Sequence, residues 1–218
     1  MKKKLIYFIL IISHLSFLLA GAFLYERERI PQIIPVNDKK ITIHYPYNFN
    51  SIGEGNAPVS VIIIGRYESN KSKIATKFTL NLLKQYPGKV HFIYCPVKIV
   101  SKPSYDKIAY GAYAAGKLGK FWEYIDYFVE TKNFTDAGLE TIVEKLKLQK
   151  IQFTQLSQSQ QAKKFYETNA KVVKDHKVQK VGTFIINGSL IGSLDSAQQL
   201  KTLIDFELKK HNKKNHSK

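Results

Sequence analysis

The distribution of apolar residues in the middle of the chain predicts two strands with a helix between them. Residues 59–64 (VSVIII) are an almost continuous apolar run, typical of a strand covered on both faces of a sheet. Residues 73–86 place apolar side chains at helical spacing, and Pro87-Gly88 ends that helix. Residues 90–94 (VHFIY) alternate as a second strand. A strand, a crossover helix and a strand form a right-handed βαβ unit, so we expect the two strands to be parallel.

The pattern changes twice further along the chain. From about residue 105 to about residue 179 the spacing is helical, and Thr135 can cap one of these helices. Residues 183–191 are two apolar runs around Asn187-Gly188, which predicts a hairpin because both positions accept a positive φ. Asp195 and Ser196 can cap a last helix that runs to about His211. The order βαβ, helices, ββα predicts an α/β fold with an inserted helical domain.

The first 25 residues predict export. Lysines 2–4 precede 21 residues without a formal charge, residues 5–25, and such a segment directs the rest of the chain across a membrane. Cleavage after Ala22 would make the segment a signal peptide, whereas its full length suits a retained single-pass anchor. Both alternatives place the protein in the periplasm or cell envelope, and the second gives membrane association through residues 5–25. Residues 26–52 are expected to be a linker with a leading strand at residues 41–45.

Composition excludes several classes of protein. The formal net charge is +17, and part of it lies in a basic tail, residues 209–218. No zinc-finger spacing or aromatic RNA-binding motif accompanies this charge, so we expect no nucleic-acid partner. The histidines are scattered and no glycine-rich phosphate loop is present, so no metal and no cofactor are expected. The single cysteine, Cys95, excludes an intramolecular disulfide.

Several stretches resemble the DsbA-like group of thioredoxin-fold, periplasmic thiol-disulfide oxidoreductases over about residues 53–208. They are Ala57-Pro58-Val59, residues 85–92 (QYPGKVHF), residues 119–124 (GKFWEY) and residues 184–188 (FIING). Their order and spacing together carry the resemblance. It implies a thioredoxin-like fold (βαβ–ββα) with the helical insertion at about residues 105–179.

The chain departs from the family at the redox site. After its first strand the family typically has an aromatic residue, an acid and a Cys-x-x-Cys-Lys stretch, whereas here residues 67–73 read YESNKSK, with Ser69 and Ser72 at both cysteine positions. The family also has a cis-proline before its Thr-Phe strand, and the matching residue is Gly182. Since a serine forms no disulfide, we interpret Ser69 and Ser72 as helix-capping, solvated residues. A serine nucleophile would need a positioned base, and no histidine occupies an obvious partner position. Gly182 indicates a constraint relaxed after loss of catalysis, or a groove reshaped for another extended ligand.

Three functions remain open. The first is a redox-inactive exported protein that binds a polypeptide or envelope partner, in a chaperone-like or assembly role. Its groove would lie between two segments, whose candidate residues are Tyr67, Glu68, Ser69, Asn70, Lys71, Ser72, Val181, Gly182 and Thr183. The second is a protein thiol-disulfide oxidoreductase that acts through Cys95 or with a partner's cysteine. We expect Cys95 to be a buried small hydrophobe, at the edge of the sheet far from the start of the helix. The third is a basic surface protein that binds anionic lipid or polysaccharide.

Overall fold

The computed structural model describes residues 49–67, 69–97, 103–178 and 180–216. They belong to one compact unit, Pro35–Lys218, which contains every core residue that the structure describes. The predicted export segment, residues 5–25, and the predicted strand at residues 41–45 lie outside the described residues. None of the described helices is long and apolar enough to span a membrane.

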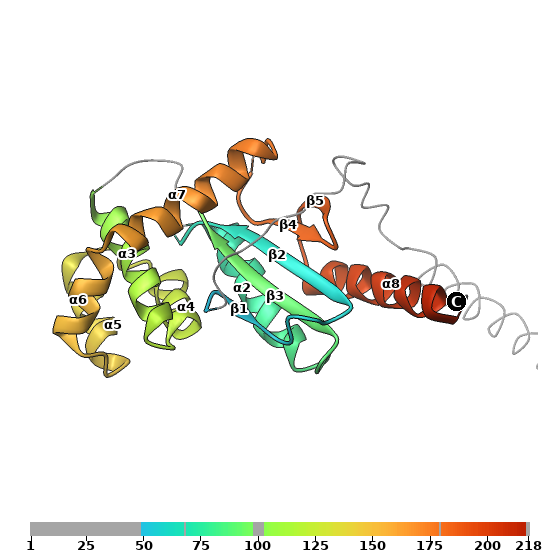
Figure 1. Ribbon diagram of the computed structural model, residues 1–218, viewed down its shortest axis with the longest axis horizontal. Coiled ribbons are helices and arrows are strands. Elements are labelled where there is room, and N and C mark those ends of the chain that lie inside the picture. The colour runs from blue at the N-terminus through green and yellow to red at the C-terminus, as the bar shows by residue number, and fades with distance from the viewer. Residues whose placement is uncertain (1–48, 68, 98–102, 179, 217–218) are drawn as a thin grey trace, which may run out of the picture. The chain divides into compact units, whose positions relative to one another are not determined.

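A five-stranded sheet in the order β1-β3-β2-β4-β5 forms the centre of the domain (Figure 1). The central strand is β2 (Val59–Gly65), which pairs in parallel with β3 (Val90–Pro96) and antiparallel with β4 (Thr183–Ile186). The edges are β1 (Ser51–Ile52), antiparallel to β3, and β5 (Ser189–Ser193), antiparallel to β4. The predicted parallel pair and the predicted thioredoxin-like α/β topology are confirmed.

Helix α2 (Asn70–Leu83) joins the two parallel strands and contacts both of them. It begins a turn earlier than the sequence pattern predicts, because its first residues are polar and hide the helical periodicity. The final helix, α8 (Ala197–His216), contacts β2 and α2. The opposite face of the sheet carries an apolar cluster that packs against valines at the end of α7 (Gln160–Asp175). The sheet is therefore covered on both faces, which explains the apolar run of β2.

The helical insertion consists of α3, α4, α5 and α6 together with the first part of α7. Their bounds are Pro103–Lys117, Phe121–Thr131, Asp136–Lys145 and Lys150–Ser157 for α3 to α6. Buried aromatic residues hold these helices together: Tyr113, Phe121, Tyr124, Phe128, Phe153 and Phe165. The predicted cap is confirmed, since the Thr135 hydroxyl accepts the Gly138 backbone N–H at 3.0 Å at the start of α5.

The predicted hairpin and the last helix are also present. Asn187 and Gly188 have φ values of 44° and 81° and form the turn between β4 and β5. At the start of α8 the Ser196 hydroxyl accepts the Gln199 backbone N–H at 3.2 Å. The helix runs to His216 rather than ending near His211, because no glycine or proline interrupts it. Most of the expected basic tail is therefore helical.

Candidate functional site

Ser69 begins α2. Its backbone is extended, with φ −84° and ψ 128°, and its hydroxyl accepts the Ser72 N–H at 3.4 Å. Its carbonyl accepts the Lys73 N–H at 3.0 Å, which starts the helical hydrogen-bond pattern. The expected capping role of Ser69 is confirmed.

Ser72 lies one turn later and is fully buried, with none of its surface exposed. Its hydroxyl oxygen accepts the Arg66 backbone N–H at 2.9 Å and so ties the loop after β2 to the first turn of α2. The solvated role expected for Ser72 is therefore wrong, because the side chain points into the loop that it stabilises. Neither serine hydroxyl has a hydrogen-bonded histidine or carboxylate within the described residues, so the structure gives neither of them a base.

Gly182 lies directly against α2. Its φ is 74°, and its N–H donates to the Ile64 carbonyl at 2.7 Å. A Cβ at this position would lie 2.7 Å from the Cβ of Lys71. A relaxed constraint does not fit this geometry, since both the left-handed backbone and the contact with Lys71 require glycine. Backbone conformation and packing therefore both constrain this position to glycine.

The structure brings the two predicted segments into contact and buries part of each of them. Tyr67 is 4% exposed and stacks on Tyr94, with ring centroids 6.4 Å apart, so it is a core residue. Thr183 is 3% exposed and pairs with Ile64 in the sheet. Glu68 lies outside the described residues.

The accessible part of this site is a small polar surface. Asn70 and Lys71 are exposed, while Ser69 and Val181 are half-buried. The Lys71 ammonium donates to the Ser193 hydroxyl at 3.2 Å and reaches across to the edge strand β5.

Lys73, the residue at the family's lysine position, is paired with a carboxylate. Glu130 on α4 binds the ammonium groups of Lys73 and Lys77, each at 2.7 Å. These hydrogen bonds lower the pKa of Glu130 below its ordinary value. Burial, and to a smaller extent the charge of Glu130, raises the pKa of Asp126 above its ordinary value. Lys73, which follows Ser72 in the sequence, thus joins α2 to α4.

Cys95 is fully buried, as expected, but its place in the sheet differs from the prediction. It pairs with Ile64 of the central strand, near the end of the sheet from which α2 starts, and not at a far edge. Its side chain belongs to the apolar cluster with Ile93 and Ile185 that faces the end of α7. A layer of sheet therefore separates the thiol from Ser69 and Ser72.

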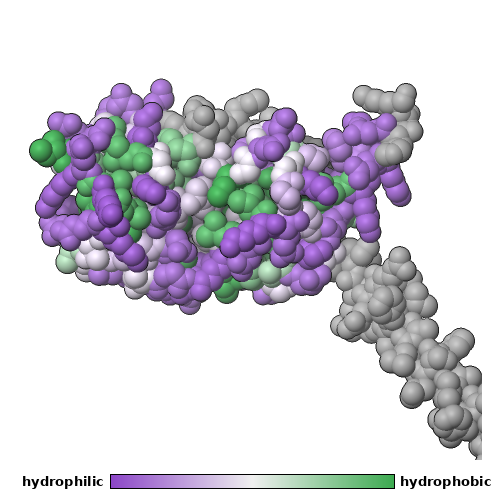
Figure 2. Space-filling model, turned by 90° about the horizontal axis from the view of Figure 1, so that it is seen from below, coloured by the Kyte–Doolittle hydropathy of each residue, from purple (hydrophilic) through white to green (hydrophobic). Residues whose placement is uncertain are grey.

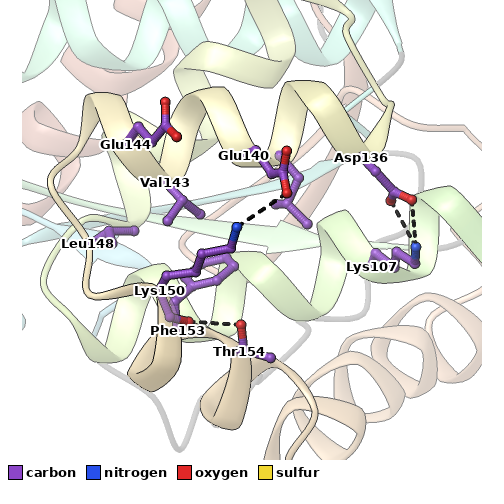
Figure 3. Close-up of a pocket in the computed structure, with 10 residues that line it drawn as sticks. Lys107, Asp136, Glu140, Val143, Glu144, Leu148, Lys150, Phe153 and Thr154 are labelled. Atoms are coloured by element: carbon purple, nitrogen blue, oxygen red, sulfur yellow. Dashed lines mark hydrogen bonds and ion pairs between the residues drawn. The ribbon is translucent and has the colours of Figure 1, made fainter.

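A cavity of about 330 Å³ lies elsewhere, in the helical insertion, between α3, α5 and α6 (Figure 3). Its apolar lining residues are Leu139, Val143, Leu148 and Phe153. Two ion pairs border it: Lys107 with Asp136 at 2.8 Å, and Lys150 with Glu140 at 3.3 Å. This cavity was not predicted from the sequence. Its only sequence signal is the spacing of Asp136, Glu140 and Glu144, which repeats every fourth residue along α5.

No group of three or more metal-ligating side chains occurs among the described residues. His91 on β3 is half-buried, and its burial lowers its pKa below the ordinary value. This histidine pairs with Ser60, near the start of β2, whereas α2 begins after the other end of that strand.

The fold and the degenerate site define a thioredoxin-type domain without its redox pair. A family model described as Thioredoxin matches residues 49–206, and the chain belongs to this family. A search of curated protein sequences found no match.

Solved structures of DsbA-like proteins share the fold. The thiol-disulfide exchange protein alpha-DsbA2 from Wolbachia pipientis is 19% identical, with a TM-score of 0.65 over 71% of this chain and 84% of its own. Alpha-DsbA1 from the same organism is 15% identical, with a TM-score of 0.68 over 79% of this chain and 96% of its own. A periplasmic thioredoxin-like protein from Salmonella enterica serovar Typhimurium is 16% identical, with a TM-score of 0.64 over 72% of this chain and 88% of its own. The chain is thus a member of the thioredoxin family that shares the fold of these proteins, and its single cysteine provides no Cys-x-x-Cys pair.

Proposed function

We propose that this protein is exported to the periplasm or cell envelope and binds a polypeptide partner there without performing disulfide exchange. The observation that carries the proposal is the position of its only thiol: Cys95 is buried on the face of the sheet opposite α2. Disulfide exchange requires a thiolate that reaches a disulfide sulfur, and complete burial among apolar residues denies Cys95 this access. The hydroxyls at the two redox positions serve the fold instead, as a helix cap and a buried hydrogen-bond acceptor.

The cavity in the helical insertion supports a polypeptide as the ligand. Its lining offers apolar contacts for one side chain, while Lys107, Asp136, Glu140 and Lys150 at its border offer charges of both signs to the neighbouring residues of a bound chain. The polar surface around Lys71 and Asn70 is a second contact region on the same domain.

Export has separate support in the sequence. Residues 5–25 carry no formal charge and follow three lysines, and a structural neighbour is described as periplasmic. Fractionation of cells that produce the full chain, followed by N-terminal sequencing, tests this part. We expect the protein in the envelope fraction, beginning either at Met1 or at Phe23, and recovery from the cytosol would contradict export.

Two assays on the purified protein test the binding function. Insulin reduction should proceed at the rate without enzyme, and Cys95→Ala should leave that rate unchanged; turnover that depends on Cys95 would establish an oxidoreductase instead. Fluorescence anisotropy with a reduced, carboxymethylated lactalbumin as an unfolded polypeptide should show binding.

A matched pair of variants locates the binding surface. Leu148→Glu places a charge in the cavity and should weaken binding at least about tenfold, since an unpaired charge in an apolar contact costs more than 1.4 kcal/mol. Ile151→Glu makes the same kind of change on α6 at a side chain that is 77% exposed and does not line the cavity, and it should leave binding unchanged. Equal losses in the two variants would exclude the cavity as the binding site.

A further inference from the structure

The helical insertion differs in charge from the rest of the protein. Residues 103–157 contain seven lysines and seven acidic residues, so their formal net charge is zero, and the whole net charge of +17 lies outside them. Apolar side chains reach the surface over the insertion, at the left of Figure 2, among hydrophilic ones. Because salt screens exposed charges beyond about 10 Å, a ligand at the insertion responds mainly to the charges near it.

Two neighbouring rows of side chains on α5 line the cavity of the insertion. Leu139 and Val143 form an apolar row, with a spacing of four residues. Asp136, Glu140 and Glu144 form an acidic row beside it, with the same spacing. Val143 is 6% exposed and directly precedes Glu144 in the chain. An apolar group that enters the cavity therefore lies beside a row of carboxylates.

The lysines that line the cavity neutralise only two of these three carboxylates. Lys107 of α3 pairs with Asp136 at 2.8 Å, and Lys150 of α6 pairs with Glu140 at 3.3 Å. Glu144 is exposed, and no hydrogen bond or ion pair joins its side chain to another described residue (Figure 3). The lining thus carries two positive and three negative charges, so the cavity is acidic although the protein as a whole is strongly basic.

We propose that the cavity selects a polypeptide segment in which a large apolar side chain is followed by a lysine or arginine, whose cation pairs with Glu144. This inference rests on the proposed polypeptide binding and adds a sequence preference to it. The cavity volume of about 330 Å³ is near the lower limit for ligand pockets, which suits one large side chain against the apolar lining. A segment with an acidic residue at the second position is disfavoured, because the Glu144 carboxylate repels it.

Fluorescence anisotropy of the purified protein with short labelled peptides tests the preference. Three hexapeptides are identical except at the residue after a central phenylalanine, which is lysine, glutamine or glutamate. The lysine peptide should bind about three- to fivefold more tightly than the glutamine peptide, as for an ion pair at a protein surface, and the glutamate peptide should bind most weakly. Non-specific attraction to a protein of net charge +17 would give the opposite order, so the observed order identifies the local carboxylate.

Matched variants assign the preference to Glu144. Glu144→Gln should remove the difference between the lysine and glutamine peptides, and Glu144→Lys should make the glutamate peptide the tightest of the three. Glu167→Gln is the control, because Glu167 on α7 is also exposed, has no side-chain partner among the described residues and does not line the cavity. This control should keep the wild-type preference. A cooperative thermal transition is recorded for every variant, so that a loss of binding is not a loss of folding.

Several results would overturn the proposal: no binding of the lysine peptide, equal binding of the lysine and glutamine peptides, or a preference that survives Glu144→Gln. Displacement of the lysine peptide by an equal concentration of phenylethylamine would assign the cavity to small amines and would also overturn it. A dimer that Glu144→Gln dissociates would assign the cavity to a second copy of the chain, with the same consequence.

The lactalbumin assay separates this failure from failure of the proposed function. If lactalbumin binds and Leu148→Glu weakens its binding, polypeptide binding at the cavity stands whatever order the peptides show. If neither lactalbumin nor any of the peptides binds, both the proposed function and the sequence preference fail.

Discussion

Lys71 and Gly182 are in direct contact, although 110 positions separate them in the sequence: a Cβ at position 182 would lie 2.7 Å from the Cβ of Lys71. This contact joins the first turn of α2 to the residue that precedes β4. It brings together the two segments between which a groove was predicted, and it makes Gly182 part of the packing of the domain.

Gly182→Ala should destabilise the protein through both backbone and packing. The left-handed backbone costs about 1–2 kcal/mol for a non-glycine residue, and the overlap with Lys71 should add about 1–3 kcal/mol. Gly119→Ala is the matched control, because Gly119 has the same φ of 74° and nothing lies within 4 Å of its added Cβ. Urea unfolding should show a larger loss at position 182. Equal losses at the two positions would mean that the contact with Lys71 contributes nothing.

Ser72→Ala should cost more stability than Ser69→Ala. Removal of the Ser72 hydroxyl takes this acceptor away from the Arg66 backbone N–H, which should lower the free energy of unfolding by about 1–3 kcal/mol. Removal of the Ser69 hydroxyl removes the cap at the partly exposed start of α2, which should lower the free energy of unfolding by about 1 kcal/mol. Ser159→Ala removes the equivalent cap of α7, and its loss of unfolding free energy is the reference for the loss in Ser69→Ala. The reverse order in urea unfolding would show that Ser72 is not the structural hydroxyl of this loop.

Cys95 should react with a thiol reagent only when the whole domain unfolds. Its side chain is buried in the cluster between the sheet and α7, so no local opening of α2 exposes it. The opening free energy from the labelling rate in low urea should equal the free energy of global unfolding. Labelling at a clearly smaller opening free energy would reveal a local opening, and disulfide chemistry at Cys95 would then become feasible.

Stability should fall above about pH 10 because of the contact between Tyr86, in the turn after α2, and α8. Burial, followed by the hydrogen bond to Asp205, raises the pKa of Tyr86, and hydrogen bonds to Asp205 and Tyr86 raise the pKa of Lys201. Groups whose pKa is higher in the folded state stabilise it while they are protonated, so this contribution is present below about pH 10. It is lost as the pH rises through the folded-state values. Tyr86→Phe should reduce the loss of urea midpoint between pH 8 and pH 11, and an unchanged loss would exclude Tyr86 as a cause.

The sequence predicted those parts of the fold that depend on local chemistry or on burial of a whole element. The run of residues 59–64 indicated the central strand because it is apolar on both faces, and Asn187-Gly188 indicated the hairpin through its φ requirements. Thr135 indicated a helix start through its side chain. The beginning of α2 was placed too late, since a polar first turn carries no periodicity.

The site was predicted in outline and not in its geometry. Alignment with the family pattern identified Ser69, Ser72 and Gly182, and the structure does place their segments together. The burial of Ser72 depends on the Arg66 backbone, and the close packing at Gly182 depends on Lys71, so neither follows from residue type. The cavity between α3, α5 and α6 arises from the packing of three separate helices, which no local pattern encodes.

The conformation of Gly182 makes loss of the redox site difficult to reverse by single substitutions. A proline there would need φ near −65°, and it has no N–H to replace the bond from Gly182 to the Ile64 carbonyl. Restoring both cysteines at positions 69 and 72 would leave that peptide in its present form, and introducing proline first would destabilise the fold before any activity returned. A Cys-x-x-Cys pair beside a proline would therefore require coordinated changes in α2 and in the segment before β4.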